Sequence, residues 1–464
     1  MSTFIENASR PAADEFASTA PPAAVSPSTK PRRIFAFQLP DKKRWKPLGY
    51  SLADQALVVG GTFLVNVLLA RTQSKNDYGM FALSYSVFTF LAGLHNAAIL
   101  EPYTVFGSGR HRGRFSQYLR LMTRSHAAMG LLLTAGLLGA CVVFRWFAPG
   151  WVTSALVGLG LAVGILLSGA FLRRVFYVQG RASLAAGSSL AFFLVLVAGL
   201  WIAVRLGALN GFSAYLILAL GWTAAGAVFA GKLRTGKAEQ SFLELEPDYW
   251  RGHLKYTRWV FASALAIQLS TQSYYWLVAG LLSVKDVADL RVIYLLVAPV
   301  DQIFIALNYL VLPAMAAHYA SGKMGKFFSL GWRFGMAATG ISALFAVVVR
   351  VAGKPVMRVL YAGRFDSLAG PLYLLALLPL MMAVGNTIND ALKAAERPKL
   401  IFYAYLASGA ATVAAGIPLV MRYGVLGAVL GVLASAAAYT AALIIGFLAT
   451  FSGEAAAVAR AIGD

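Results

Sequence analysis

The chain has 464 residues, of which 59% are hydrophobic and only 13% are charged, and its mean hydropathy is +0.68. Little of it is left for a soluble catalytic domain once the long apolar stretches are set aside. The formal net charge is +21, but the basic residues are spread over many short segments between apolar stretches. This distribution excludes a nucleic-acid-binding protein, whose basic residues gather on one soluble face.

The chain begins with a tail that has no apolar core. Residues Ala8–Pro31 are rich in Ala, Pro and Ser and are expected to be disordered. They are not a signal peptide, since no apolar run of that kind follows the charges. Residues Arg32–Trp45 mix basic and aromatic side chains, which suits either a segment on the anionic inner leaflet or a solvated linker. Residues 1–47 are therefore assigned to a basic N-terminal tail.

Twelve apolar stretches follow, each about as long as the roughly 20 residues that cross a bilayer as a helix. They are Leu52–Ala70, Met80–Leu100, Ser125–Phe147, Val152–Leu172, Ala182–Val204, Phe212–Gly231, Trp259–Leu282, Val292–Leu312, Leu330–Val349, Ala369–Asn389, Ile401–Met421 and Val425–Leu448. A membrane barrel would show alternating polar and apolar residues instead of continuous apolar runs. The chain is thus predicted to be an all-α integral membrane protein.

The basic residues also predict the orientation of these helices. Most of the 40 Lys and Arg residues lie in the N-terminal tail and in the loops on the same side of the membrane as that tail. Cytoplasmic loops carry such an excess of Lys and Arg. Both termini are therefore predicted to lie in the cytoplasm.

The spans divide into two sets of six. Residues Gly180–Leu184 before the fifth span match Glu396–Leu400 before the eleventh, and an R-x-G-x-L sequence ends both spans, at Arg205–Leu209 and Arg422–Leu426. Six helices in each half give the halves the same orientation, related by an axis along the membrane normal. We expect six-helix bundles at 48–231 and 259–448 around a central cavity, a cytoplasmic linker at 232–258 and a cytoplasmic tail at 449–464.

Polar residues inside the spans mark candidate cavity positions, since such residues tend to line transport pathways. Helical spacing places them on one face of each of three spans. The candidates are Gln55, Thr62 and Asn66 in the first span, Gln268, Thr271, Gln272 and Tyr275 in the seventh, and Asp301 and Asn308 in the eighth. Hydrogen bonding between helices would explain each of them equally well when taken singly.

Charged residues in and near the spans fall into two groups. Asp301 is the only ionisable residue expected deep in a span, where it would relay a proton, bind a cation or pair with a base. Asp54, Glu101 and Asp390 are expected near water at the inner ends of their helices. Basic residues near span ends would either attract phosphate into a cavity or simply reach the membrane surface. They are Arg71, Arg124, Arg145, Arg291 and Lys393.

Cysteine and histidine give no support for a metal or redox centre. Cys141 is the only cysteine, and its position in the third span suits a small packing residue. The five histidines are scattered and include no pair spaced by four residues. We therefore expect no cofactor.

Several segments of the chain resemble a known family. Asp54–Leu57, Leu68–Arg71, Asp77–Leu83, Gly93–Asn96 and Leu100–Pro102, with Val105–Gly107, Arg173–Arg181, Leu360–Phe365 and Tyr423–Ala428, are similar to bacterial polysaccharide (O-antigen type) flippases. These belong to the multidrug/oligosaccharidyl-lipid/polysaccharide exporter superfamily, and the likeness extends from about Leu48 to Leu448. Arg71 and Glu101 fall within the matching motifs, but the match assigns them no role.

The resemblance implies a flippase that moves a polyprenyl-pyrophosphate-linked oligosaccharide across the bacterial inner membrane for polysaccharide biosynthesis. It implies two six-helix halves around a cavity that is often cationic. The lipid-linked oligosaccharide and membrane lipids would then be its partners, together with a polysaccharide polymerase and a chain-length regulator. Arg71 near the cavity mouth would suit the pyrophosphate. Asn, Gln, Thr and Tyr side chains would suit sugar hydroxyl groups.

Two other functions compete with this interpretation. The first is an ion-coupled exporter of small molecules or drugs, because residues Gly107–Arg114 loosely resemble the basic loop of major facilitators, although the expected acid is missing. The second is a membrane glycosyltransferase or polysaccharide polymerase. Such an enzyme would present catalytic residues on large outer loops, but the largest one expected here, Arg350–Leu368, has Asp366 as its only acid.

Overall fold

The computed structural model describes residues 42–108, 115–147, 153–233 and 246–463, and the regular elements in these ranges are all helices. In chain order they are α1 (Lys42–Thr72), α2 (Lys75–His95), η1 (Asn96–Leu100), α3 (Glu101–Ser108), α4 (Phe115–Phe147), α5 (Ser154–Val178), α6 (Ala182–Arg205), α7 (Gly211–Phe229), η4 (Ala230–Lys232), α8 (Glu246–Leu281), α9 (Val284–Ala320), α10 (Met324–Tyr361), η6 (Asp366–Leu368), α11 (Ala369–Leu375), α12 (Leu378–Ala394), α13 (Pro398–Ala411), η7 (Thr412–Gly416) and α14 (Ile417–Gly463). The predicted disordered tail and most of the predicted membrane-surface segment lie outside the described residues.

The helices are long enough and apolar enough to cross a membrane. Nine segments of the described chain meet both requirements, and the longest, Pro398–Ser452, is broken into two spans at Gly424. Gly424 has φ 59°, a left-handed conformation that interrupts the helix and that glycine adopts without strain. Helices α8 and α9 contain 36 and 37 residues, which also exceeds the length that a bilayer requires. The predicted all-α membrane fold with twelve spans is therefore confirmed.

The junction between the first two spans of each half has the same cap. Ser74 precedes α2 and its hydroxyl accepts a hydrogen bond from the backbone amide of Asp77. Ser283 precedes α9 and accepts one from the amide of Asp286 in the same way. Each serine thus satisfies an amide that the first helical turn would otherwise leave unpaired.

Two further junctions repeat their backbone conformation. Arg181 and Arg397, which directly precede α6 and α13, have φ/ψ values of −109°/56° and −109°/53°. Gly207 and Gly424, in the two R-x-G-x-L sequences, have φ 63° and 59°. The short sequence matches between the halves thus correspond to similar backbone conformations at these positions.

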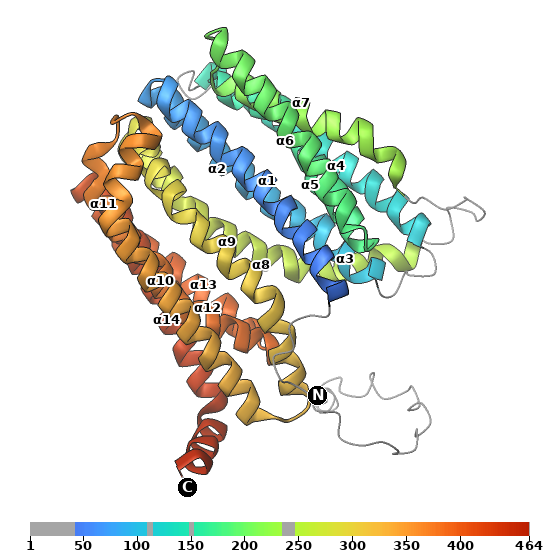
Figure 1. Cartoon of the computed structure of the whole chain (residues 1–464), viewed down its shortest axis with the longest axis vertical. Coiled ribbons are helices and arrows are strands. Elements are labelled where there is room, and N and C mark those ends of the chain that lie inside the picture. The colour runs from blue at the N-terminus through green and yellow to red at the C-terminus, as the bar shows by residue number, and fades with distance from the viewer. Residues whose placement is uncertain (1–41, 109–114, 148–152, 234–245, 464) are drawn as a thin grey trace, which may run out of the picture. The chain divides into compact units, whose positions relative to one another are not determined.

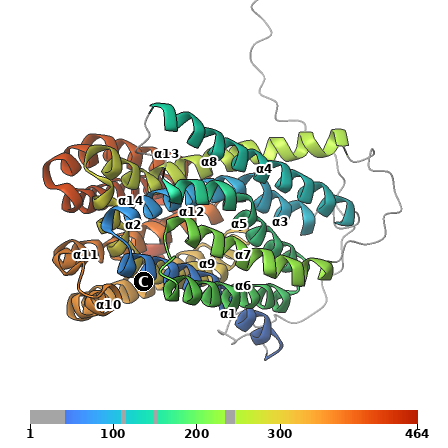
Figure 2. The ribbon, with the colours of Figure 1, turned by 90° about the horizontal axis from the view of Figure 1, so that it is seen from above.

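The helices form two groups, shown in Figures 1 and 2. In the first group α5 packs between α4 and α7, and α6 packs on α7; in the second, α10, α12, α13 and α14 pack together. Contacts between the groups run mainly through α2, which packs along α8 and α9. In Figure 1, α1 and α14 have their outer ends at the bottom, while α1 ends and α2 begins at the top. We call these the lower and upper ends.

Two glycines let the groups approach closely along α2. A Cβ atom at Gly79 would lie 2.0 Å from the carbonyl oxygen of Val284 at the start of α9. A Cβ atom at Gly93 would lie 1.9 Å from Nε2 of Gln268 on α8. The backbone contact requires glycine at position 79, whereas a larger residue at position 93 would force the Gln268 side chain to move.

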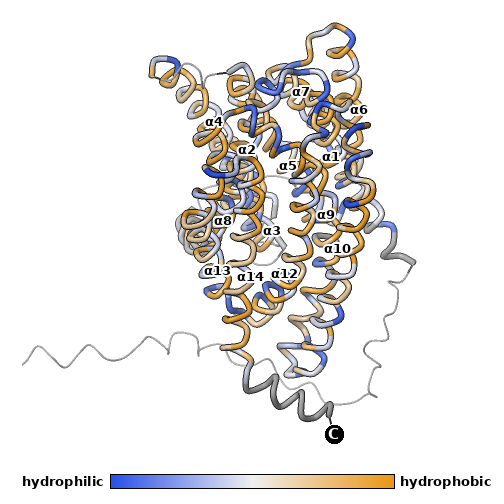
Figure 3. Tube along the Cα trace, turned by 90° about the vertical axis from the view of Figure 1, so that its left-hand side faces the viewer, coloured by the Kyte–Doolittle hydropathy of each residue, from blue (hydrophilic) through white to orange (hydrophobic). Residues whose placement is uncertain are grey.

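Large apolar side chains cover the outside of the bundle. On α4, Leu131 and Leu132 are 71% and 72% exposed, and on α10 Trp332 is 70% exposed. Hydrophobic residues dominate the middle of the helices in Figure 3, while hydrophilic ones gather toward the helix ends. An apolar surface of this extent suits hydrocarbon rather than water.

Three helix boundaries differ from the prediction. Helix α8 begins at Glu246, so the second half of the predicted linker 232–258 is helical. Helix α10 continues to Tyr361, which leaves only a short loop where the outer loop Arg350–Leu368 was expected. Helix α14 continues to Gly463, through the predicted tail. Hydropathy measures the thickness of the apolar layer, whereas a helix continues until its backbone hydrogen bonding is interrupted.

The expectation that Asp54 and Asp390 lie near water was wrong. Asp54 is fully buried and accepts hydrogen bonds from Arg173 Nε and Nη2 at 2.8 and 2.6 Å, from the Tyr177 hydroxyl at 2.6 Å, and from Ser189. These bonds join α1 to α5 and α6. Asp390 on α12 is only 1% exposed. Their neighbours come from helices far away in the sequence, so position along a single helix did not reveal the burial.

Candidate functional site

A cavity of about 620 Å³ lies between the two groups of helices. Its walls come from α1 and α2 of the first group and from α8, α9, α12, α13 and α14 of the second. The polar and aromatic residues that line it are Thr62, Phe63, Tyr85, Thr89, Ser270, Thr271, Gln272, Tyr274, Tyr275, Arg291, Tyr294, Asp301, Gln302, Asn386, Tyr405, Ser408, Ser435 and Tyr439. The size and the mixed lining are typical of small-molecule and cofactor sites.

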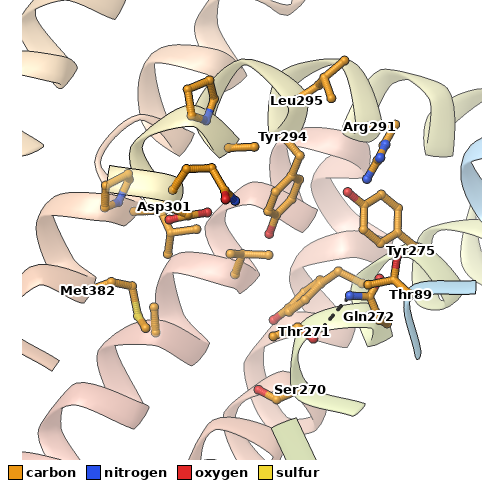
Figure 4. Close-up of a pocket in the computed structure, with 18 of the residues that line it drawn as sticks. Thr89, Ser270, Thr271, Gln272, Tyr275, Arg291, Tyr294, Leu295, Asp301 and Met382 are labelled. Atoms are coloured by element: carbon orange, nitrogen blue, oxygen red, sulfur yellow. Dashed lines mark hydrogen bonds between the residues drawn. The ribbon is translucent and has the colours of Figure 1, made fainter. Parts of the chain in front are cut away.

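Five of the ten candidate residues from the sequence line this cavity. They are Thr62, Thr271, Gln272, Tyr275 and Asp301. Figure 4 shows four of them in one view with Arg291 and Tyr294, and Gln272 donates a hydrogen bond to the Thr271 hydroxyl at 3.3 Å. Residues from α1, α8 and α9 therefore meet at one site, as the expected central cavity requires.

Three candidates from the first span have different surroundings. Asn66 lies one turn above Thr62 and is fully buried behind the cavity wall. Gln55 is exposed near the lower end of α1, and Arg71 is exposed at its upper end. Neither lines the cavity. The residues share a helical face, but α1 changes its neighbours along its length, so the face meets different surroundings at each level.

The remaining two candidates make contacts between helices. The side-chain amide of Gln268 packs against Gly93 of α2. Asn308 on α9 donates a hydrogen bond to Asp390 Oδ1 on α12 at 3.4 Å. These two residues correspond to the alternative interpretation of hydrogen bonding or packing between helices.

Arg291 is the residue of the cavity that sequence reasoning interpreted differently, as a group near a span end. It lies on the cavity wall beside Tyr275 (Figure 4), and its Nε donates a hydrogen bond to Asn66 Oδ1 at 3.0 Å. Its guanidinium carbon lies 4.5 Å from the centre of the Tyr85 ring. None of the ion pairs found among the described residues involves Arg291. A cation with only neutral partners is therefore available to an anionic ligand.

Asp301 gives the cavity an acidic group at some distance from Arg291. The two residues are ten positions apart on α9, which corresponds to about 15 Å along the helix axis. Tyr294 lies between them, as Figure 4 shows. Asp301 is exposed and takes part in none of the ion pairs of the described chain. The cavity thus has a basic group toward the upper end and an acidic group lower down.

Tyrosine is the commonest aromatic residue of the lining. Tyr274, Tyr275, Tyr294, Tyr405 and Tyr439 come from four different helices of the second group, and Tyr85 comes from the first. Each offers a ring face together with a hydroxyl that donates and accepts hydrogen bonds. Arg291, Tyr294, Ala298 and Gln302 follow helical spacing on α9. A predicted span that began at Arg291 instead of Val292 would therefore have identified part of this face.

No family model and no curated protein sequence matches the chain. Solved structures do match it. A multidrug resistance transporter of the MATE family of the MOP superfamily, in an inward-facing conformation, superposes with a TM-score of 0.71 at 13% identity, covering 88% of this chain and 96% of its own. The chain has the fold of such transporters.

Two other structures share this fold. An outward-facing MATE family transporter of the MOP superfamily has a TM-score of 0.60 at 11% identity and covers 89% of this chain and 96% of its own. The lipid II flippase MurJ, in an inward closed conformation, has a TM-score of 0.63 at 13% identity and covers 86% of this chain and 87% of its own. Drug exporters and a flippase thus have the same fold, so the fold alone does not distinguish between these functions.

Proposed function

We propose that the protein is a membrane transporter that moves a polyprenyl-pyrophosphate-linked oligosaccharide across the bacterial cytoplasmic membrane for surface polysaccharide synthesis. The two groups of helices would open the cavity alternately to each side. Both termini would lie in the cytoplasm. A polysaccharide polymerase and a chain-length regulator would use the product, and membrane lipids would surround the bundle.

Arg291 is the single observation that carries this proposal. It lines the cavity, contacts only neutral partners among the described residues and offers a planar set of donors. Pyrophosphate oxygens form short, charge-assisted hydrogen bonds with such a group. An unpaired basic residue in a membrane-spanning helix is expensive unless a ligand or water compensates its charge. Arg291 replaces Arg71 as the proposed pyrophosphate contact, because Arg71 lies outside the cavity lining.

The remainder of the lining suits an oligosaccharide. Hydroxyl and amide groups of Thr62, Thr271 and Gln272 would replace water around sugar hydroxyls, whose transfer into hydrocarbon costs several kcal/mol for each unpaired group. The tyrosine rings would pack against the apolar faces of sugar rings. The polyprenyl chain needs no such cavity, since it is soluble in the bilayer.

Reconstituted protein tests the proposal directly. Proteoliposomes would contain a fluorescent polyprenyl-pyrophosphate disaccharide, and its exposure on the outer leaflet would be measured by an impermeant quencher. Wild-type protein should speed equilibration between leaflets, and Arg291→Gln should slow it about tenfold or more, since a charge-assisted hydrogen bond contributes about 1.5–3 kcal/mol. Arg358→Gln, a change at an exposed arginine, is the matched control. Equal rates for wild type and empty liposomes would refute the proposal.

A drug exporter is the second candidate, and Asp301 favours it. An acidic group without a basic partner in the cavity would bind an organic cation or exchange a proton. In that case, drug addition to proteoliposomes should drive a proton or sodium flux that Asp301→Asn abolishes. The flippase proposal instead predicts that Asp301→Asn affects lipid-linked oligosaccharide transport less than Arg291→Gln does.

A further inference from the structure

Several polar contacts join the two groups of helices at the upper end, while the Trp276 indole donates to the Ser86 hydroxyl further down and the His253 ring hydrogen-bonds to the Ala98 carbonyl oxygen near the lower end. Lys75 Nζ in the first turn of α2 lies 2.9 Å from Asp289 Oδ1 in the second turn of α9. The same ammonium group lies 5.0 Å from the centre of the Phe365 ring, which follows α10. Asp289 is 15% exposed and Lys75 is 35% exposed, so the pair is partly shielded from water. This pair joins the first half to the second.

A second contact joins the two halves at the same upper end. Arg364, in the short loop after α10, donates hydrogen bonds from Nη1 to the carbonyl oxygens of Ala70 and Arg71, at 2.8 and 2.9 Å. These carbonyl groups belong to the last turn of α1. Carbonyl groups at the end of a helix receive no hydrogen bond from amides of the same helix and carry a partial negative charge. A cation from the second half thus caps a helix of the first half.

The side chains of α8 and α9 become more exposed below these contacts, although α2 stays packed on α8. Side chains of α9 between residues 287 and 298 are buried or half-buried, whereas Asp301 and Ile303 are exposed. On α8, residues 274–279 are buried or half-buried, whereas Leu265 and Leu269 are exposed. Within these stretches, the side chains nearer the upper contacts are thus more covered than Asp301, Ile303, Leu265 and Leu269.

The contact between Arg291 and Asn66 lies between these upper contacts and the cavity. Asn66 is fully buried; its amide group donates to the Thr62 carbonyl at 2.9 Å, and its Oδ1 also accepts from the Tyr78 hydroxyl at 3.4 Å. Thr62 and Tyr78 belong to the same half as Asn66. The bond from Arg291 is thus the one that crosses to the other half, and Asn66 keeps hydrogen-bonding partners if that bond breaks.

We propose that Arg291 couples the binding of an anion in the cavity to the opening of the upper end. We name the three contacts the upper gate: Arg291 with Asn66, Lys75 with Asp289, and Arg364 with the end of α1. An anion and Asn66 Oδ1 compete for the Arg291 guanidinium, so an anion that binds Arg291 loosens the contact nearest the cavity. The inference rests on the proposed function, since it requires an anionic ligand.

The competition favours the anion for a physical reason. A hydrogen bond from guanidinium to a phosphate oxygen is roughly twice as strong as one to a neutral amide oxygen. In the closed state Arg291 divides its donors between Asn66 and the ligand, whereas in the open state all of them are free for the ligand. The anion therefore binds the open state more tightly, and only such a difference in affinity shifts the equilibrium between the two states.

Distances between spin labels test the coupling in the full-length protein. Cys141, which is buried, would be replaced by serine, and labels would be attached at exposed Asn76 in the first half and exposed Ser367 in the second. A second pair, Asn76 with exposed Leu206, lies within the first half and serves as the control distance. Inorganic pyrophosphate is the probe, and its binding is measured separately by calorimetry.

Pyrophosphate should lengthen the distance between labels at positions 76 and 367 and leave the control distance unchanged. Asn66→Ala should raise the open fraction about tenfold without pyrophosphate, since it removes one charge-assisted hydrogen bond. Asn66→Asp should have the opposite effect, because a carboxylate holds Arg291 and competes with the anion. Arg291→Gln should abolish the response to pyrophosphate.

A matched control exists at the lower end of the first half. Arg174 Nη2 donates to Asn96 Oδ1 at 3.2 Å, a bond of the same chemical type that does not join the two halves. Asn96→Ala should therefore leave the distance between positions 76 and 367 unchanged.

Two failures are distinguishable. If pyrophosphate binds wild-type protein but the distance does not change, or if Asn66→Ala and Asn66→Asp both behave as wild type, the coupling is wrong and the proposed function stands. If pyrophosphate does not bind at all, both the anion site and the coupling are wrong.

Discussion

Two charged residues inside this protein, the fully buried Asp54 and the half-buried Arg291, have opposite surroundings. Asp54 in the first half accepts hydrogen bonds from Arg173, Tyr177 and Ser189, all of which belong to the same half. Among the described residues Arg291 in the second half has neutral partners only, and one of them, Asn66, belongs to the other half. The Asp54 carboxylate is paired with a cation of its own half, whereas the Arg291 guanidinium has no anionic partner among the described residues. The Arg291 charge is therefore available to a ligand.

This difference separates structural charges from candidate functional ones. A buried carboxylate that accepts hydrogen bonds from a basic partner and two hydroxyl groups holds α1, α5 and α6 in a single arrangement, because breaking the pair leaves a charge without a partner. A charge held by neutral groups can exchange partners at much lower cost. Substitutions at four positions test this distinction, in order of decreasing expected effect.

Breaking the compensated pair should destabilise the protein most. Asp54→Asn leaves Arg173 buried without a carboxylate, and we expect the free energy of unfolding to fall by about 3–5 kcal/mol. Chemical unfolding in detergent micelles, followed by tryptophan fluorescence, measures it. Stability equal to wild type would show that Asp54 and Arg173 do not form this pair.

Removing the uncompensated charge should affect function more than stability. Arg291→Gln should weaken pyrophosphate binding by about 1.5–3 kcal/mol and leave the free energy of unfolding within about 1 kcal/mol of wild type. Arg291→Lys, which keeps the charge but loses the planar set of donors, should show intermediate affinity. Calorimetric titration and the unfolding measurement together provide the test. A large loss of stability with unchanged affinity would reverse the interpretation.

Asp390 sharpens the comparison, because it is a buried carboxylate without an ion-pair partner among the described residues. Its Oδ2 has no hydrogen-bonding partner, and its Oδ1 accepts only the long bond from Asn308. Asp390→Asn should be neutral or stabilise the protein by up to about 1 kcal/mol, since it removes an uncompensated charge. Thermal unfolding measured beside Asp54→Asn should therefore show changes of opposite sign or of very different size.

An exposed ion pair should matter least. Arg358 is 64% exposed and pairs with Asp366 at 2.6 Å within the second half. Arg358→Gln should change the free energy of unfolding by less than about 1 kcal/mol, because water and salt screen the pair. A loss as large as that of Asp54→Asn would mean that exposure does not distinguish these pairs.

Three candidate residues from one predicted span line the cavity for a reason that concerns a single helix. Thr271, Gln272 and Tyr275 follow helical spacing within one span, and the structure brings them to one cavity. The same spacing could not predict that Gln268 on that face meets Gly93 of α2. Contact between two helices depends on their crossing, which the pattern along one helix does not contain.

By itself the sequence determined the helical class, the number of spans and the repeated junctions, because hydropathy, capping serines and turn glycines act over a few residues. Only the tertiary structure decided which charges are compensated. Asp54 meets Arg173, and Arg291 meets Asn66, across more than a hundred residues of chain, so packing alone determines whether a buried charge finds an opposite one. The position of Arg291 in the cavity follows from that packing, and the proposed function depends on it.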